Sequence, residues 1–109
     1  MRRAKVFYKE EEAGILKQFD DGSFEFRYHD AWFNNSDKPS ISLTLPKDQQ
    51  VYSSPYLFPF FYNMLPEGSN KQVVCYQMRI DESDHFGILL ATAKSDTIGA
   101  VRVEKIDAK

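Results

Sequence analysis

Two pairs of neighbouring residues carry side chains that could do acid–base chemistry: His29 with Asp30, and Asp84 with His85. In such a site a carboxylate orients an imidazole, which then accepts or donates a proton. Residues adjacent in sequence point in different directions on a strand or a helix, and no nucleophile accompanies either pair. We therefore predict that neither pair is catalytic and that His85 is a surface group in the first turn of a helix.

The other reactive residues also lack the pattern of an active site. The single cysteine, Cys75, can form neither an internal disulfide nor a four-cysteine metal site, and its neighbours Val74 and Tyr76 indicate a small buried side chain. The acidic residues 10–12 are typical of a solvated turn. The sequence contains no metal-binding spacing, phosphate-binding glycine loop or kinase-type set of aspartates and lysine. We predict that the chain is not an enzyme and holds no cofactor or metal.

The composition is that of one globular domain. The 109 residues are 42% hydrophobic and 28% charged, as in ordinary folded domains. The formal net charge is −2 and the longest basic run is Arg2-Arg3, which disfavours direct DNA or RNA binding. No apolar run approaches the roughly 20 residues that span a bilayer, and no export signal is present. With one cysteine, which fits a reducing compartment, this predicts a cytoplasmic, single-domain protein over residues 1–109.

The first half of the chain has the two-residue period of β-strands. Residues 3–9, 12–19 and 22–29 alternate between apolar and polar side chains. The Asp-Gly step at 21–22 predicts a tight hairpin turn, so the three strands should form an antiparallel meander. The side chains expected on one face are Val6 and Tyr8 in the first strand, Ala13, Ile15 and Phe19 in the second, and Phe24, Phe26 and Tyr28 in the third.

A loop or single helical turn and then a fourth strand are expected next. Residues 29–40 mix aromatic residues with Asn, Ser, Asp and Pro, as loops do. Residues 41–46, ISLTLP, alternate again until the proline ends the pattern. The side chains that would share a face of this strand are Ile41, Leu43 and Leu45.

The second half changes to helical spacing. Pro55 and Pro59 suit early helix positions, and a short helix should end at Leu65, before Pro66. Its face toward the sheet would be Leu57, Phe61 and Leu65.

Two more helices and a last strand complete the predicted fold. Ser69 with Gln72 resembles a capping box, and Asp81 with Asp84 offers the start of a third helix. Residues 97–106 are β-branched and should return to the sheet. The expected helix faces are Val73, Tyr76, Gln77 and Ile80, and then Phe86, Leu89, Leu90 and Ala93. The fold class is α+β, a small antiparallel sheet of about five strands packed with two to three short helices in the C-terminal half.

The stretch FPFFYNMLPEG, residues 58–68, holds a large aromatic surface for so small a domain. Phe60 and Met64 fall on the flank of the predicted helix, so they either complete the core or belong to a partner surface. Trp32 offers the same choice between an interaction hot spot and a plug at the edge of its own sheet. The sequence leaves both choices open.

This stretch, followed by DESDHFGILLATAKSDTIGAVRV at residues 81–103, resembles the N-terminal domain of the HipA family of bacterial toxin kinases. KPSISLTLP at 38–46 and the opening residues 3–28 are similar to the early strands of that domain. The aromatic-Leu-Pro-Glu-Gly element and the Asp-x-Ile-Gly-Ala-Val ending are together fairly specific. The resemblance covers nearly all of the second half of the chain.

A full HipA continues into a Ser/Thr kinase body, whereas this sequence ends at Lys109. The ATP-binding, catalytic and metal-binding residues of the kinase are therefore expected to be absent. A stand-alone copy of the domain resembles the HipS small proteins of tripartite HipBST toxin–antitoxin systems. This resemblance implies an antitoxin that binds and inhibits a separate HipT-like Ser/Thr kinase, with a HipB-like helix-turn-helix protein as the DNA-binding member of the complex.

The Pro-Glu-Gly turn is the candidate partner surface. It lies between two predicted helices, so it and the next three residues should project as a short, ordered, polar loop. Family members often have a bulky residue after this turn, where this chain has Ser69 and Asn70, so contacts here would be polar. Ser69 is either a helix N-cap, which we favour, or a phosphate acceptor. The partner-binding candidates are Phe60, Met64, Pro66, Glu67, Gly68, Ser69, Asn70, Lys71 and Trp32.

Two alternatives to an inhibitor remain. The chain could be a non-inhibitory structural subunit that completes a split HipA-like kinase, or a binding module for an unrelated protein. A neighbouring gene for a kinase that lacks this domain, beside a helix-turn-helix gene, would favour the inhibitor.

Overall fold

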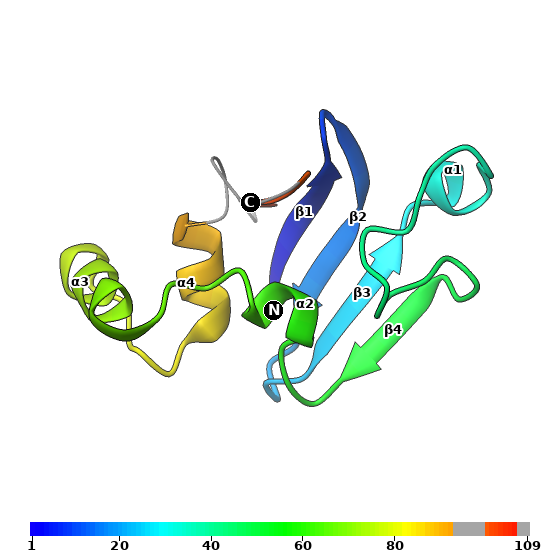
Figure 1. Ribbon diagram of the computed structural model, residues 1–109. Helices are drawn as coiled ribbons and strands as arrows, with labels where there is room; N and C mark the ends of the chain where they lie inside the picture. Colours follow the sequence, from blue (N-terminus) through cyan, green and yellow to red (C-terminus); the bar gives the residue numbers. More distant parts are fainter. Residues whose placement is uncertain (93–99, 107–109) are drawn as a thin grey trace.

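The computed structural model describes residues 1–92 and 100–106, and in this part of the chain five antiparallel strands form one sheet with four helices (Figure 1). The order of the strands across the sheet is β4-β3-β2-β1-β5. The fold class is α+β, as predicted. The strands are β1 (Arg2–Tyr8), β2 (Glu11–Gln18), β3 (Phe24–Tyr28), β4 (Val51–Ser54) and β5 (Val101–Lys105), and the helices are α1 (Asp30–Phe33), α2 (Pro59–Tyr62), α3 (Gly68–Met78) and α4 (His85–Thr92).

The predicted meander of β1, β2 and β3 is confirmed, and its third strand supplies the centre of the core. Phe24, Phe26 and Tyr28 are all buried on one face of β3. The Phe26 ring lies 4.8 Å from the Tyr28 ring and 5.9 Å from the ring of Phe61 in α2. Gly22 has a φ of 91°, so the turn before β3 uses a conformation that glycine adopts without strain. The alternation therefore predicted this face correctly.

The face predicted for the second strand is right for Ala13 and wrong for Ile15 and Phe19. The strand buries Ala13, Gly14 and Leu16, and Ile15 points to the opposite face. The cause is an irregularity in pairing with β1, where the register shifts between Val6 and Phe7. An extra residue in one strand reverses the side-chain alternation on either side of it, which a uniform two-residue period does not foresee.

The predicted fourth strand at residues 41–46 is also wrong, although the five-strand count is right. Ile41 and Leu45 are buried, but Leu43 between them is 99% exposed and the segment forms a turn. The strand that pairs with β3 is β4, later in the chain. The loop and single helical turn expected before this segment are present as α1 and its flanks.

Helix α2 is only one turn long, but its predicted core residues are confirmed. Leu57, Phe61 and Leu65 are 7%, 0% and 8% exposed, respectively. Pro59 occupies the first turn of the helix, as the missing N–H of proline allows. Phe60 and Met64 are partly buried and pack against the core. In Figure 1, α2 lies over the sheet, whereas α3 lies far from it beyond α4.

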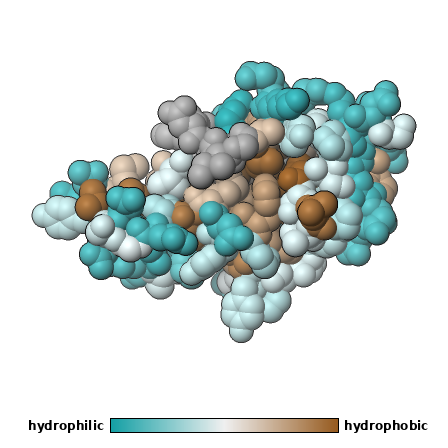
Figure 2. Space-filling view, viewed as in Figure 1, coloured by the Kyte–Doolittle hydropathy of each residue, from teal (hydrophilic) through white to brown (hydrophobic). Residues whose placement is uncertain are grey.

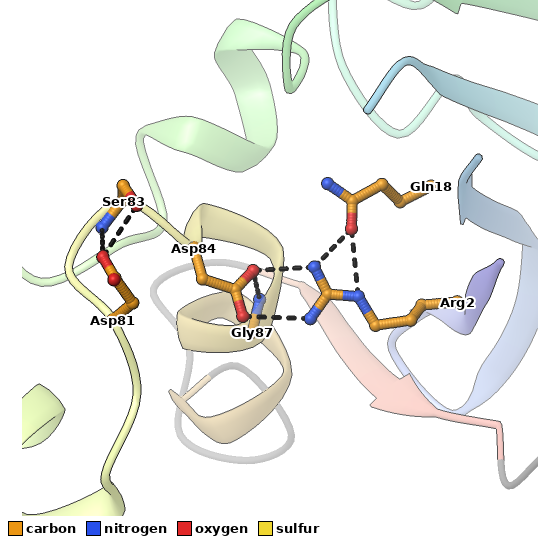
Figure 3. Close-up of polar contacts among 6 residues, drawn as sticks. All are labelled: Arg2, Gln18, Asp81, Ser83, Asp84 and Gly87. Atoms are coloured by element: carbon orange, nitrogen blue, oxygen red, sulfur yellow. Dashed lines mark hydrogen bonds and ion pairs between the residues drawn. The ribbon is translucent and has the colours of Figure 1, made fainter. Parts of the chain in front are cut away.

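Helix α4 begins at the predicted N-cap, Asp84, whose carboxylate accepts a hydrogen bond from the backbone N–H of Gly87 at 3.1 Å. The same carboxylate binds the guanidinium of Arg2 at 2.7 and 3.1 Å (Figure 3). Phe86 and Leu89 are buried and Leu90 is partly buried, as expected. Ala93 and the beginning of the predicted strand at 97–99 lie outside the described residues. The rest of that strand is β5.

The opposite face of the sheet is largely polar. Lys5, Ile15 and Arg27 are neighbours in register across β1, β2 and β3 on this side. Lys17 and Glu25 form an ion pair there at 3.7 Å. Within residues 1–92 and 100–106, no helix has the length and apolarity that crossing a bilayer would require.

Candidate partner-binding surface

The turn between α2 and α3 is built on a buried leucine. Leu65 is 8% exposed and lies three residues beyond the end of α2 at Tyr62, so the helix end predicted at Leu65 is wrong; Pro66 follows in the turn. Glu67 has an extended backbone and precedes the first turn of α3, and Gly68 has a φ of 57°, in the left-handed region. The turn borders a small cavity of about 180 Å³ lined by Tyr62, Leu65, Pro66, Glu67, Gly68 and Lys71.

The side chains after this turn are available to a partner. Glu67, Gly68, Ser69 and Asn70 are exposed and Lys71 is half-buried. The predicted capping box is wrong, because the N-cap of α3 is Glu67 and no side chain caps the helix. Ser69 is the second residue of α3, and its exposed hydroxyl does not cap the helix.

Helix α3 is exposed along most of its surface. Val73, Tyr76 and Met78 are 52%, 87% and 52% exposed. Cys75, as predicted, is buried, and it is the one buried residue of the helix. Of the face expected for this helix, Val73, Tyr76 and Gln77 are exposed and Ile80, beyond the end of α3, is partly buried. The face is exposed because α3 contacts α4 and stands away from the sheet (Figure 1).

The sequence did contain a signal of this exposure. Apolar residues occur at 73, 74, 76 and 78, which spreads them around the helix instead of gathering them into the single stripe of a helix that packs on a core. Figure 2 shows hydrophobic side chains at the α3 end of the molecule, apart from those over the centre of this face.

A groove of about 630 Å³ runs beside α3 and the segment that follows it. Hydrogen bonds from the backbone N–H of Ser83, and secondarily from its hydroxyl, hold the pKa of Asp81 below its ordinary range. This carboxylate makes one edge of the groove negative at neutral pH. Arg79 ends the helix in the left-handed conformation, with φ 56°. The groove is lined by Gln72, Cys75, Tyr76, Ile80, Asp81 and Glu82.

Trp32 lies away from this surface and in the interior. It is 4% exposed, its ring packs 5.8 Å from that of Tyr8, and its Nε1–H donates to the carbonyl of Pro39 at 2.9 Å. This position matches the plug alternative, and any contact of Trp32 with a partner stays a prediction. Phe60 and Met64 are only partly accessible, because both pack against the core.

Residues of the two candidate acid–base pairs, His29 with Asp30 and Asp84 with His85, make structural contacts instead. His29 lies 2.6 Å from Glu12, not beside a nucleophile, and Asp84 is engaged by Arg2 and the first turn of α4. The half-buried ring of His85 lies 5.1 Å from that of Tyr62, at the junction of α4 and α2. Among the residues that the structure describes, no group of three or more His, Cys, Asp or Glu side chains is placed to hold a metal ion.

Comparison with known families gives a match over most of the chain. The model of the HipA N-terminal domain matches residues 4–104. A solved structure described as the N-terminal domain of HipA toxin superposes with a TM-score of 0.74 and 32% sequence identity, covering 100% of this chain and 96% of that one.

Two curated proteins are also similar. An uncharacterized protein of Haemophilus influenzae is 36% identical over 107 residues, which is 96% of this chain and 93% of that protein. A putative kinase, Y4mE, of Sinorhizobium fredii is 27% identical over 103 residues. That match covers 94% of this chain but 24% of the putative kinase.

Proposed function

This chain belongs to the HipA N-terminal domain family, and from that premise we propose that it is a non-catalytic toxin–antitoxin component that binds a separate HipT-like Ser/Thr kinase and inhibits it. In this proposal residues 1–109 act as one domain in the cytoplasm. The complex also includes a HipB-like helix-turn-helix protein, which makes the contacts to DNA.

The observation that carries the proposal is the uncovered helix α3. A helix in a small domain normally buries one apolar stripe, yet α3 buries only Cys75 and leaves Val73, Tyr76 and Met78 half or more exposed. Apolar surface that a domain leaves uncovered is typical of an interaction site. The matching segment makes up 24% of the putative kinase Y4mE. A similar domain within a kinase chain supports a kinase as the protein that covers this surface.

The turn before α3 suggests how binding could inhibit. Glu67 and Lys71 stand at a turn fixed between two helices, so docking costs little conformational entropy. A rigid wedge of this kind in a kinase cleft would oppose the closure that assembles the catalytic groups. The Haemophilus relative, matched over 93% of its length, supports a role for the domain outside a kinase chain.

The proposal is tested by co-expressing the chain with a HipT-like kinase that lacks this domain. We expect growth arrest by the kinase to be relieved, the two proteins to co-purify, and the phosphorylation rate of the purified kinase to fall when the chain is added. A stable complex whose kinase activity is unchanged or higher would instead support a structural subunit that completes the kinase. Absence of any complex would show that the proposal is wrong.

We also expect the purified chain to have no phosphotransfer activity, because its family match is to the HipA N-terminal domain. Incubation with labelled ATP and a generic protein acceptor should yield no labelled product. Turnover that co-purifies with the chain through successive purification steps would contradict this expectation.

A further inference from the structure

The segment between α1 and β4 presents one leucine at its tip. Leu43 is 99% exposed, more than any other large hydrophobic side chain in the described part of the chain. The residues two positions away on each side, Ile41 and Leu45, are 6% and 2% exposed. The segment therefore has two buried anchors and a fully exposed aliphatic residue between them.

Hydrogen bonds fix the conformation of this tip. The hydroxyl of Tyr28 accepts from the backbone N–H of Ile41 at 3.1 Å and donates to the carbonyl of Leu45. The backbone N–H of Leu45 also donates to the carbonyl of Ser42 at 3.1 Å, which closes a turn around Leu43. Because Tyr28 belongs to the core of the sheet, the tip is held directly by the most buried part of the domain.

The base of the segment is closed as well. The Nζ of Lys47 donates to the carbonyls of Asn35 and Lys38 at 2.6 and 2.7 Å, and its backbone N–H donates to Ser40 Oγ at 2.9 Å. The indole of Trp32 supports the same base through its bond to Pro39. A buried tryptophan thus stabilises the loop that carries Leu43.

The polar side chains beside Leu43 are already satisfied. Ser42 Oγ accepts from the backbone N–H of Thr44 at 3.1 Å and lies 2.9 Å from Thr44 Oγ1. A partner could therefore bury the Leu43 side chain without breaking these hydrogen bonds. This chemistry fits an apolar pocket in the partner.

The tip lies on the same side of the sheet as the proposed partner surface. Tyr28, which holds the tip, packs on Phe26, and Phe26 packs on Phe61 of α2. A groove of about 310 Å³ lies beside Phe24, at the other end of β3, and includes Tyr56 and Tyr62, which are 78% and 48% exposed. In Figure 1 the chain between α1 and β4 runs over this side of the sheet. A protein that covers the α2–α3 turn can therefore continue onto Leu43.

Resting on the proposed function, we infer that Leu43 is an anchor residue that inserts into an apolar pocket of the kinase partner. Single exposed leucines on flexible loops are common and need no explanation. This leucine differs because its loop is already ordered, so burial of the side chain would be offset by little loss of entropy. The occupant of the tip is the kinase rather than a second copy of this chain, since the tip lies on the same side of the sheet as α2 and the turn proposed to bind the kinase.

The test compares three forms of the full chain, wild type, Leu43→Ala and Leu43→Met, in calorimetric titrations against a purified HipT-like kinase that lacks this domain. We expect Leu43→Ala to weaken binding about tenfold, from the loss of a buried leucine side chain. Leu43→Met should bind nearly as the wild type does, because it restores apolar volume. Melting temperatures of the three isolated chains should agree, because the side chain is exposed.

Each other outcome overturns the inference. If the wild type binds the kinase and Leu43→Ala binds it equally well, the proposed function stands but Leu43 is not an anchor of the interface. Wild type that does not bind the kinase would overturn both. A lower melting temperature for Leu43→Ala would show a structural role, and a dimer of the wild type that Leu43→Ala dissociates, without a change in kinase binding, would identify a second copy as the occupant.

Discussion

At the scale of single residues, Asp84 determines where α4 begins and how it meets the sheet. Its carboxylate caps the first turn of the helix and forms a two-point ion pair with Arg2 of β1. Arg2 also receives support from Gln18 of β2, to which its Nε donates at 3.0 Å (Figure 3). The guanidinium lies 5.2 Å from the centre of the Phe86 ring. The cap was predictable from the sequence, but the arginine was not, because it is 82 residues away.

Gly87→Ala should destabilise the domain, although alanine usually favours a helix over glycine. A Cβ at this position would lie 2.3 Å from Asp84 Oδ2, so the carboxylate must leave its place between Arg2 and the helix. We expect a loss of about 1–3 kcal/mol in the free energy of unfolding. Denaturant titration measures it.

A double-mutant cycle supplies the control for Gly87→Ala. In an Asp84→Ala background the carboxylate is gone, so Gly87→Ala should cost much less or become stabilising. If Gly87→Ala instead stabilises the otherwise unchanged protein, the close contact between this position and Asp84 does not exist.

The Asp84 ion pair should also make stability depend on pH. Hydrogen bonds from Arg2 lower the pKa of Asp84 in the folded protein from its ordinary value of 3.8. Because the folded pKa lies below the unfolded one, this stabilisation is fully present above the unfolded pKa and is lost as the pH falls through the folded pKa. We expect the difference in unfolding free energy between wild type and Asp84→Asn to be constant from about pH 7 to pH 5 and to shrink below about pH 4.

Other carboxylates do not confuse this measurement. Asp21 and Asp30 also have lowered pKa values, through hydrogen bonds from nearby groups, but both are present in both proteins and cancel in the difference. Asp81 is coupled to Asp84, whose charge raises its pKa, so Asp81→Asn is placed in both proteins for this comparison. A difference that stays the same down to pH 3 would mean that the negative charge of Asp84 contributes nothing to its contact with Arg2.

At the scale of elements, the core is formed where β3 meets α2 and α4. Phe26 in β3 and Leu89 in α4 are both fully buried. We expect Phe26→Ala or Leu89→Ala to reduce the free energy of unfolding by roughly 3 kcal/mol, from lost burial and an unfilled cavity. Thermal melts should show a midpoint lower by about 10 °C or more.

Leu43→Ala is the matched control for Leu89→Ala, because it makes the same chemical change at a 99% exposed position. It should leave the melting midpoint nearly unchanged. A loss well under 1 kcal/mol at both Phe26 and Leu89 would contradict the placement of these two faces in the core.

Side-chain alternation predicted a strand correctly where neither a shift in strand pairing nor a turn held by side-chain hydrogen bonds interrupts it. The alternation in β3 and the Asp-Gly turn before it are local signals, and the structure has both. The faces of β2 and of residues 41–46 failed for two different physical reasons. A shift in pairing with β1 reversed the first, and the bonds of Tyr28 to the backbone at Ile41 and Leu45 folded the second into a turn.

The sequence indicated the position of the exposed turn, but not the exposure of α3 and Leu43. The exposed turn at Glu67 and Gly68 is where the sequence indicated, because proline and glycine interrupt the helical spacing there. The exposure of α3 beyond it was missed, since an apolar residue such as Val73 was assigned to a core that lies on the other side of α4. Leu43 was missed because its alternation with buried neighbours imitates a strand.

At the scale of the whole molecule, the domain is one-sided. The side chains of β3 that face α2 are buried, and the opposite face carries ion pairs such as Lys17 with Glu25. The exposed apolar residues of α3 and the tip at Leu43 both belong to the side with the helices or to its end. A partner that binds by apolar contact should therefore approach from that side, with the polar face of the sheet left in water.

This arrangement leads to a prediction for the α2–α3 turn. Among the residues that the structure describes, neither the Glu67 nor the Lys71 side chain forms an ion pair or side-chain hydrogen bond. The backbone N–H of Lys71 donates to the carbonyl of Glu67 in the first turn of α3. Replacing both side chains should therefore leave the fold intact. We expect Glu67→Ala combined with Lys71→Ala to weaken binding to a HipT-like kinase about tenfold, because charged groups at such a turn would meet complementary groups in the partner.

The matched control removes one negative and one positive charge elsewhere, by Glu10→Ala with Lys5→Ala; Glu10 is exposed in the turn between β1 and β2, and Lys5 is half-buried on the polar face of the sheet. The net charge is unchanged in both double variants, so a general electrostatic effect cannot separate them. Pull-down and relief of growth arrest should fall together for the turn variant, and the melting temperature should stay the same. If the turn variant still binds and neutralises the kinase as the control does, the binding surface does not include this turn, and α3 with Val73 and Tyr76 is the next surface to change.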